Sequence, residues 1–369
     1  MRVQPSKPKA GVLAGVAAGL LLLAACGSGS GGTTAAASTG GANSLAGLAK
    51  LPAAQLQSKA EQEGQVNWYT TFAADDVSGM VAAFNKVYPK IKVNALRLSA
   101  DQLPPRVITE QRGNEFNADV VSGDAPQVDQ LINANAMQPY CPSDQQPLPA
   151  GQTMPKGYCG NVYVVTTVIV YNPEALQRQG LQAPKTLQDL TQPQWKGKFS
   201  MDPSAVNLYE GLINTMGHDK AQALLKQLGA NQPKLVESHT LALTQVEAGE
   251  PPASASAYGY KSASEQRKNP GKVAFINPTP LPTSFTPIDV ARNAPHPAAA
   301  ALFINWMTSQ DGQQAVIDVT NHTSLRTDVK NDTSVWDPQK WPPAWGDANL
   351  SSTLYNQYAS EMKTALGAS

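Results

Sequence analysis

The chain has 369 residues, and its 28 lysine and arginine residues balance 28 aspartate and glutamate residues, so the formal net charge is zero. Charged residues make up only 15% of the chain. They form no basic stripe or polybasic patch, which argues against a nucleic-acid partner and against electrostatic binding to a membrane surface. About 310 residues follow the low-complexity N-terminal region, enough for two domains with separate cores.

The N-terminal region has the three parts of an export signal. Basic residues within positions 1–9 precede an uncharged apolar run from Ala10 to Leu23. A bilayer core needs about 20 apolar residues, so this run suits a signal peptide rather than a spanning helix. Leu23-Ala24-Ala25-Cys26 resembles the bacterial lipobox, whose cysteine receives diacylglycerol. We predict a lipoprotein signal peptide over residues 1–25 and lipidation of Cys26; the alternative is an ordinary signal peptide with an incidental cysteine.

Residues 26–50 have the composition of a linker. The stretch from Gly27 to Ala46 has no charge and almost no apolar bulk, so it cannot bury enough surface to offset its ordering entropy. We predict a flexible tether there, with the folded part beginning near Leu51. No later segment has 18 uninterrupted apolar residues, so the lipid is the expected anchor, at the extracytoplasmic face of the cell membrane.

The next part of the chain alternates short strands with longer helices, the pattern of an α/β sheet. Val77, Met80, Val81 and Phe84, for example, recur at the three- and four-residue spacing of an amphipathic helix, and Pro89 ends it. The sequence predicts strands at 66–69, 91–98 and 118–121, each followed by a helix, at 75–88, 103–112 and 126–134.

Two cysteines remain after Cys26 is assigned to lipid. Cys141 and Cys159 lie in a segment rich in proline and glycine, in a chain predicted to be exported. In an oxidising compartment a disulfide between them is favoured. The alternatives are a metal pair or a reactive thiol, and no histidine lies nearby to support a metal site.

A second α/β unit follows, and the chain then returns. The long β-branched run at 163–171 ends at Asn172-Pro173, which turns the chain into a helix from Glu174. The sequence predicts further strands at 198–201, 234–236, 253–257 and 287–291, and helices at 207–216, 219–228, 241–248, 297–307, 310–319 and 353–366.

Six short stretches, at 66–71, 117–121, 168–172, 190–203, 248–260 and 297–314, carry a family resemblance. The most distinctive reads Gln194-Trp195-Lys196-Gly197-Lys198 and then Asp202-Pro203. In this order and spacing the stretches resemble the extracellular solute-binding proteins of ABC importers, in the branch that includes ferric-iron binders. The likeness covers roughly residues 62–325.

The resemblance implies a two-lobed, periplasmic-binding-protein-like (type 2) α/β fold with a hinge between the lobes. The expected parts are a first lobe over 51–165, a second lobe over 166–286, and a return to the first lobe with a C-terminal tail over 287–369. A small solute would bind in the cleft, favour closure, and be passed to an ABC permease and its ATPase. We expect a monomer.

Ligands in such folds meet the carboxyl ends of strands and the first turns of helices. The candidate binding residues at such positions are Thr70, Thr71, Ser122, Asp124, Thr167, Asn207, Tyr258 and Tyr260. Their hydroxyls, with backbone amides at helix starts, favour an anionic or oxygen-rich solute. The alternative for Thr70, Thr71, Ser122 and Asp124 is helix capping; for the two tyrosines, on one face of a strand, it is packing.

Ferric iron is the second candidate cargo, and no resident cofactor is expected. In the ferric binders that the chain resembles, adjacent tyrosines ligate the metal; Tyr260 aligns with one of them, and Tyr258 would be its partner. The loop at Thr70-Thr71-Phe72-Ala73 lacks the family's histidine, and the four histidines have no metal-ligand spacing. A small anion or polar organic solute is therefore preferred.

Two other classes of function compete with solute binding. The sequence has no G-x-S-x-G, H-E-x-x-H or C-x-x-C motif. Asp119 and Asp124 suit a strand end and a helix cap better than an acid/base pair. We therefore predict that the chain is not an enzyme, and a non-transport surface lipoprotein or scaffold is the remaining alternative.

Overall fold

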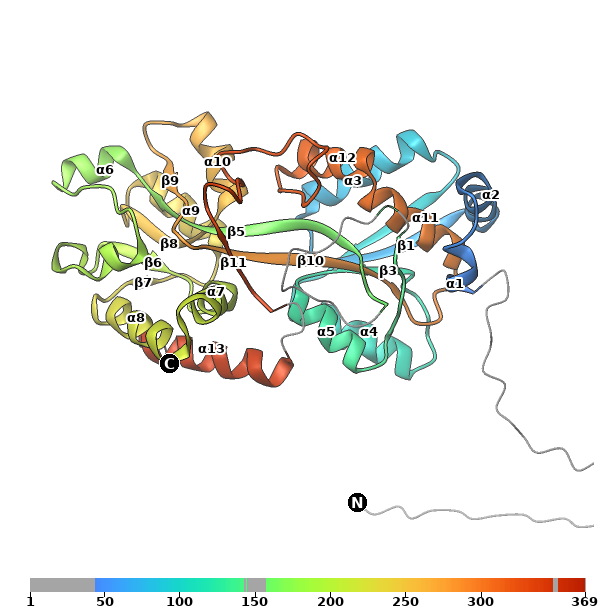
Figure 1. Cartoon of the computed structure of the whole chain (residues 1–369), viewed down its shortest axis with the longest axis horizontal. Coiled ribbons are helices and arrows are strands. Elements are labelled where there is room, and N and C mark those ends of the chain that lie inside the picture. The colour runs from blue at the N-terminus through green and yellow to red at the C-terminus, as the bar shows by residue number, and fades with distance from the viewer. Residues whose placement is uncertain (1–43, 143, 145–156, 348–350, 369) are drawn as a thin grey trace, which may run out of the picture. The chain divides into compact units, whose positions relative to one another are not determined.

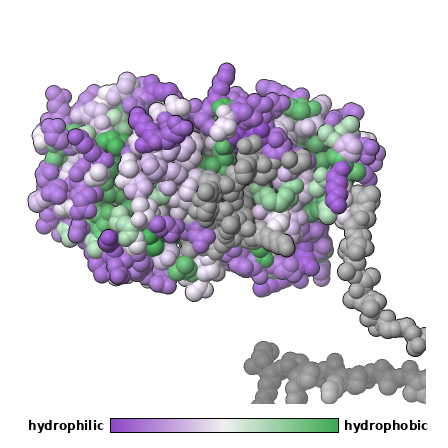
Figure 2. All heavy atoms as spheres, viewed as in Figure 1, coloured by the Kyte–Doolittle hydropathy of each residue, from purple (hydrophilic) through white to green (hydrophobic). Residues whose placement is uncertain are grey.

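The computed structural model describes residues 44–142, 144, 157–347 and 351–368. The predicted signal peptide, Cys26 and most of the tether predicted over 26–50 lie outside these residues. The described residues belong to one unit, and none of its helices combines the length and apolar character needed to cross a membrane. Hydrophilic residues predominate on the face shown in Figure 2.

A mixed sheet organises the fold, with the strand order β2-β1-β3-β10-β5-β8-β6-β7. Parallel strands lie at both ends, as predicted for an α/β protein. Those of the first lobe are β1 (Gln65–Thr70), β2 (Lys92–Arg97) and β3 (Val120–Ser122). Those of the second lobe are β6 (Phe199–Met201), β7 (Lys234–Leu235) and β8 (Ala253–Tyr258).

Two long strands, β5 (Asn161–Tyr171) and β10 (Leu281–Ala291), join the lobes. They pair with each other in antiparallel fashion, with Thr166 opposite Thr283. Beyond this shared ladder, β10 pairs with β3 in the first lobe and β5 pairs with β8 in the second. Figure 1 shows the two strands side by side between the two groups of helices. Each lobe therefore completes its sheet with a strand that also belongs to the other.

Helices cover both faces of the first-lobe sheet. One face carries α1 (Leu45–Leu48), α2 (Ala53–Glu63), α3 (Ala74–Val87), α11 (Pro297–Thr308) and α12 (Gln310–Thr320); the other carries α4 (Leu103–Arg112) and α5 (Ala125–Asn133). The predicted apolar stripe of α3 is confirmed, because Met80 and Phe84 are fully buried and the Phe84 ring lies 5.0 Å from that of Phe303 on α11. A short strand, β4 (Met137–Gln138), pairs with β10.

The folded part begins earlier than Leu51. Ser44 Oγ accepts a hydrogen bond from the Gly47 amide and starts α1, whose Leu45 and Leu48 are buried in the same core as α11. The predicted tether is thus wrong for its last residues. Two leucines three residues apart suffice to dock one helical turn, although the surrounding composition is that of a linker.

In the second lobe, α7 (Val206–Met216), α8 (His218–Ala230) and α13 (Ser352–Leu366) share one core, with α6 (Pro173–Arg178) at its edge. The helices α9 (His239–Ala248) and α10 (Gly259–Lys268) lie on the other face. Two short strands extend the sheet, since β9 (Ala274–Ile276) pairs with β5 and β11 (Pro343–Trp345) pairs with β10. The C-terminal helix therefore packs in the second lobe, and only residues up to about α12 return to the first. The sequence predicted the helix in the tail, but it did not predict that this helix packs against the second lobe.

The disulfide predicted between Cys141 and Cys159 is confirmed. Asp119, considered above for acid/base chemistry, is fully buried and structural. Its carboxylate accepts hydrogen bonds from the Asn67 amide and from the amide and ring of His296, at 2.7–2.8 Å. These contacts connect β1 to the chain that enters α11.

Candidate functional site

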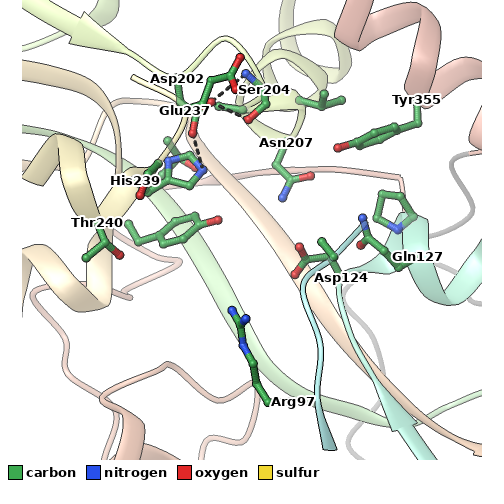
Figure 3. A pocket seen from close by; sticks show the side chains of 17 residues that line it. Arg97, Asp124, Gln127, Asp202, Ser204, Asn207, Glu237, His239, Thr240 and Tyr355 are labelled. Atoms are coloured by element: carbon green, nitrogen blue, oxygen red, sulfur yellow. Dashed lines mark hydrogen bonds and ion pairs between the residues drawn. The ribbon is translucent and has the colours of Figure 1, made fainter. Parts of the chain in front are cut away.

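A cavity of about 440 Å³ lies between the lobes. The first lobe contributes Arg97, Ala100, Asp124, Pro126 and Gln127; β5, the second lobe and α13 contribute Thr167, Asp202, Ser204, Ala205, Val206, Asn207, Glu237, Ser238, His239, Thr240, Tyr258 and Tyr355. Figure 3 shows these side chains converging on one space. Most carry hydroxyl, amide or charged groups, so the wall is built for a polar ligand.

The N-termini of three helices, α5, α7 and α9, border this cavity. Only α9 has a side-chain cap, since Ser238 Oγ accepts from the Leu241 amide. Ala205 cannot cap α7, and the Asp124 side chain does not cap α5, although capping was its predicted alternative role. Helix N-termini present unpaired amides and a partial positive charge. Their convergence favours an anionic group in the cavity.

His239 is held in a fixed orientation at the wall. Its Nδ1 donates to the backbone oxygen of Ser256, and its Nε2 lies 3.6 Å from Asp202 Oδ2. Asp202 Oδ1 in turn accepts from the amide and hydroxyl of Ser204 at 2.8 and 2.6 Å. The Tyr258 ring lies 4.0 Å from the imidazole. Asp202 is therefore engaged with protein groups, and a ring nitrogen of His239 faces a carboxylate at the wall.

The groups on the first-lobe side are unengaged. Arg97 ends β2, is exposed, and points into the cavity in Figure 3. The half-buried Asp124 carboxylate has no hydrogen-bond partner within the described ranges. The Gln127 Oε1 atom is buried and likewise unpartnered there. A ligand could therefore supply an anionic group to the Arg97 guanidinium and hydrogen-bond donors to the Asp124 and Gln127 oxygens.

Burial and neighbouring charge shift the titration of these groups. Burial raises the pKa of Asp124, although the nearby His239 charge opposes the shift. Burial, and then the charges of Asp124 and Tyr260, raise the pKa of Tyr258 far above its usual value. The Tyr258 phenol is therefore a neutral hydrogen-bond donor at physiological pH.

Four of the predicted binding residues line the cavity: Asp124, Thr167, Asn207 and Tyr258. Thr167 is 5% exposed, and its hydroxyl has no hydrogen-bond partner in the described part of the chain. Asn207 lies in the first turn of α7 and its Nδ2 donates to Ser284 Oγ on β10 at 3.2 Å. These four come from four different parts of the chain: the start of α5, the middle of β5, the first turn of α7 and the end of β8.

Thr70, Thr71 and Ser122 do not line it. Thr70 and Ser122 are fully buried, with their hydroxyls 2.8 Å apart. The Trp68 indole donates to Ser122 Oγ at 2.9 Å, and the Phe72 amide donates to Thr70 Oγ1. These hydroxyls satisfy polar groups inside the first lobe, and Thr71 lies beside Gly123. Placing Thr70 and Ser122 in the wall, or as helix caps, was wrong for this reason; Thr71 is half-buried and is not among the residues that line the cavity.

Tyr260 also lies off the wall, because β8 ends at Tyr258, two residues before it. At Gly259 a side chain would lie 2.3 Å from Thr166 Oγ1, and the chain turns there into α10. Tyr260 is therefore a helical residue, and the prediction that both tyrosines share one strand face is wrong. Its ring stacks on His322 at 3.7 Å and lies 5.9 Å from that of Tyr258.

Sequence reasoning missed several wall residues, chiefly Arg97, Gln127, Glu237, His239 and Tyr355. The strand-end rule would have found Arg97 at the end of β2, and the helix-start rule His239 at the start of α9. No local signal identifies Tyr355, which reaches the cavity from the C-terminal helix. As for metal ligands, no group of three or more His, Cys, Asp or Glu side chains in the described ranges is arranged to hold an ion.

Residues 79–343 match the family model of bacterial extracellular solute-binding proteins. The chain belongs to this family. It is 28% identical over 159 residues to the "Fe(3+)-binding periplasmic protein" of Serratia marcescens, a match covering 40% of this chain and 46% of that relative, less than half its length. The sequence-based recognition of the family is thus confirmed.

Solved structures share the two-lobed fold. Iron-bound HitA from Pseudomonas aeruginosa superposes with a TM-score of 0.69 at 20% identity, covering 82% of this chain and 99% of that one. AfuA from Actinobacillus pleuropneumoniae, with exogenous fructose-6-phosphate bound, gives 0.72 at 18% identity, covering 83% and 100%. AfuA is a periplasmic binding protein, and the predicted periplasmic-binding-protein-like architecture of this family member is confirmed.

Proposed function

We propose that this protein is the solute-binding component of an ABC importer and captures a small anionic, hydroxyl-bearing solute between its lobes. The observation that carries the proposal is the convergence of three helix N-termini and Arg97 on one interlobe cavity. Because a solute there touches both lobes, its binding favours the closed state, which a permease can recognise.

The remaining wall groups favour one class of solute, the phosphorylated or carboxylated polyols. Arg97 and the helix ends suit the anionic group. The unengaged Asp124 carboxylate and Gln127 Oε1 are acceptors for ligand hydroxyls. A cavity of about 440 Å³ falls within the usual range for small-molecule sites. The sugar phosphate bound to the related AfuA fold supports this class.

We also propose a location and partners for the protein: the outer face of the cell membrane, with an ABC permease and its ATPase. A lipid at Cys26 would hold it at the extracytoplasmic face of the cell membrane, which raises its effective concentration beside the permease and ATPase. It would act as a monomer, without catalysis, resident cofactor or nucleic acid. The family of binding proteins and the lipobox-like sequence support this arrangement.

Thermal unfolding with fructose 6-phosphate, fructose and inorganic phosphate tests the solute class. Fructose 6-phosphate at 100 times its Kd should add about 2.7 kcal/mol of stability, while fructose should add little. Equal shifts with both sugars would contradict the anionic assignment. A closure-dependent change in small-angle scattering is expected with the bound solute; no change with any solute would favour a scaffold.

Ferric iron is the second candidate cargo, supported by the name of the Serratia marcescens relative and by the Tyr258 and Asp124 oxygens in the wall. Iron bound through Tyr258 should give a visible phenolate-to-iron charge-transfer band on titration with ferric citrate. Tyr258→Phe should weaken the band, whereas Tyr171→Phe, off the cavity wall, should not. A colourless mixture without tight iron binding would rule out ferric iron as the cargo.

A further inference from the structure

We propose that the C-terminal helix α13 is part of the binding site and that its Tyr355 contacts the bound solute. The inference rests on the proposed function, because it concerns the same cavity. The family match ends at residue 343, ahead of α13, and so assigns nothing to this helix.

The C-terminal end of α13 is fixed in the second lobe. Glu361 Oε2 accepts from the Tyr209 hydroxyl at 2.8 Å and lies 2.7 Å from His218 Nε2. Met362 and Leu366 are buried in the second-lobe core. At Gly229 of α8 a side chain would lie 2.0 Å from the Ala365 backbone oxygen, so the two helices meet backbone to backbone. The helix therefore moves with the second lobe.

The other end of α13 reaches the cavity and the first lobe. Its residues contact α5, whose Pro126 and Gln127 line the same cavity. In Figure 3, Tyr355 extends into the space that Asn207 and Gln127 border. A side chain held by one lobe and lying near the other is well placed to touch a solute as the lobes close.

The chemistry of Tyr355 fits ligand contact better than packing. Its hydroxyl has no hydrogen-bond partner in the ranges that the structure describes, and it belongs to neither second-lobe core cluster. Tyr358, one turn on, shows the packing arrangement: its ring lies 5.7 Å from that of Tyr209 within the core. Burial, and then the charges of Asp124 and Asp202, raise the pKa of Tyr355, so its phenol remains a neutral donor for a ligand oxygen.

Calorimetric titration of the full folded chain with fructose 6-phosphate tests the contact. Tyr355→Ala, which removes both ring and hydroxyl, should weaken binding about tenfold. Tyr355→Phe should lose a smaller part, attributable to the hydroxyl. The matched control is Asn356→Ala, an exposed neighbour on the same helix, which should bind like the wild type. A Tyr355→Ala affinity within about twofold of the control would overturn the inference while leaving the proposed function intact.

Failure of the proposed function would look different, because the wild type itself would not bind. Tyr355 can then be tested without solute, by hydrogen exchange of α5 (Ala125–Asn133). If Tyr355 forms the wall against this helix, Tyr355→Ala should speed exchange in its first turns and Asn356→Ala should not. Unchanged exchange in both variants would overturn the assignment of Tyr355 to the wall.

Discussion

Replacing Arg97 with alanine is expected to weaken the binding of fructose 6-phosphate roughly 30-fold, the loss typical of a charge-assisted hydrogen bond. Arg97 is an unengaged guanidinium at the cavity wall and has no ion-pair partner within the described residues. Its planar guanidinium can donate two parallel hydrogen bonds to an anionic group. Calorimetry on the wild type and the variant at one ionic strength measures the effect.

Two further variants make this prediction specific. Arg97→Lys retains the charge but loses the two parallel donors, so its affinity should fall between those of the wild type and Arg97→Ala. Arg112→Ala removes an exposed arginine from the end of α4, away from the cavity wall, and should bind like the wild type. If Arg97→Ala and Arg112→Ala bind alike, Arg97 does not hold the anionic group.

The stability of the protein is expected to fall by roughly 3 kcal/mol between pH 4.5 and about pH 7 because of Glu210. Glu210 lies on α7, is 3% exposed, and burial raises its pKa to about 7. The folded state therefore binds this proton more tightly than the unfolded chain does. The stabilisation is fully present below the unfolded pKa, about 4.3, and is lost as the pH rises through the folded value.

Glu210→Gln isolates this contribution from those of other titrating groups. The amide keeps an oxygen that accepts from the Asp347 amide, as the carboxyl does, but carries no charge at any pH. Urea unfolding of both proteins at pH 5 and pH 8 gives the difference. Relative to wild type, the variant should gain stability at pH 8; an equal loss in both proteins would assign the pH dependence to other groups.

Most of the fold follows from local sequence patterns. Helices such as α3 and α8 could be predicted because their apolar residues repeat at helical spacing, and the run that forms β5 is β-branched. For β10 the sequence predicted only residues 287–291, because the first half of the strand is rich in proline and hydroxyl residues. The exceptions depend on tertiary contacts. The turn of α1 forms because Leu45 and Leu48 find a site in the core with α11, and α10 begins where Gly259 packs against Thr166.

The site is less accessible to sequence reasoning, because a hydroxyl at a strand end can face either the cavity or the interior. Tyr258, at the end of β8, faces the cavity. Thr70 and Ser122, at equivalent strand ends, instead satisfy each other and the Trp68 indole. Only the packing around Trp68 decides between these outcomes. Tyr355 lies beyond any such rule, since its position depends on how a distant helix docks.

The crossing of β5 and β10 has a consequence for biogenesis. The first lobe takes β10 as the neighbour of β3, and α2 packs against α11, so its core needs residues up to Val316 of α12. The second lobe likewise completes its core with α13, the last helix. Neither lobe can finish folding until the chain has been synthesised as far as α12 for the first lobe and α13 for the second.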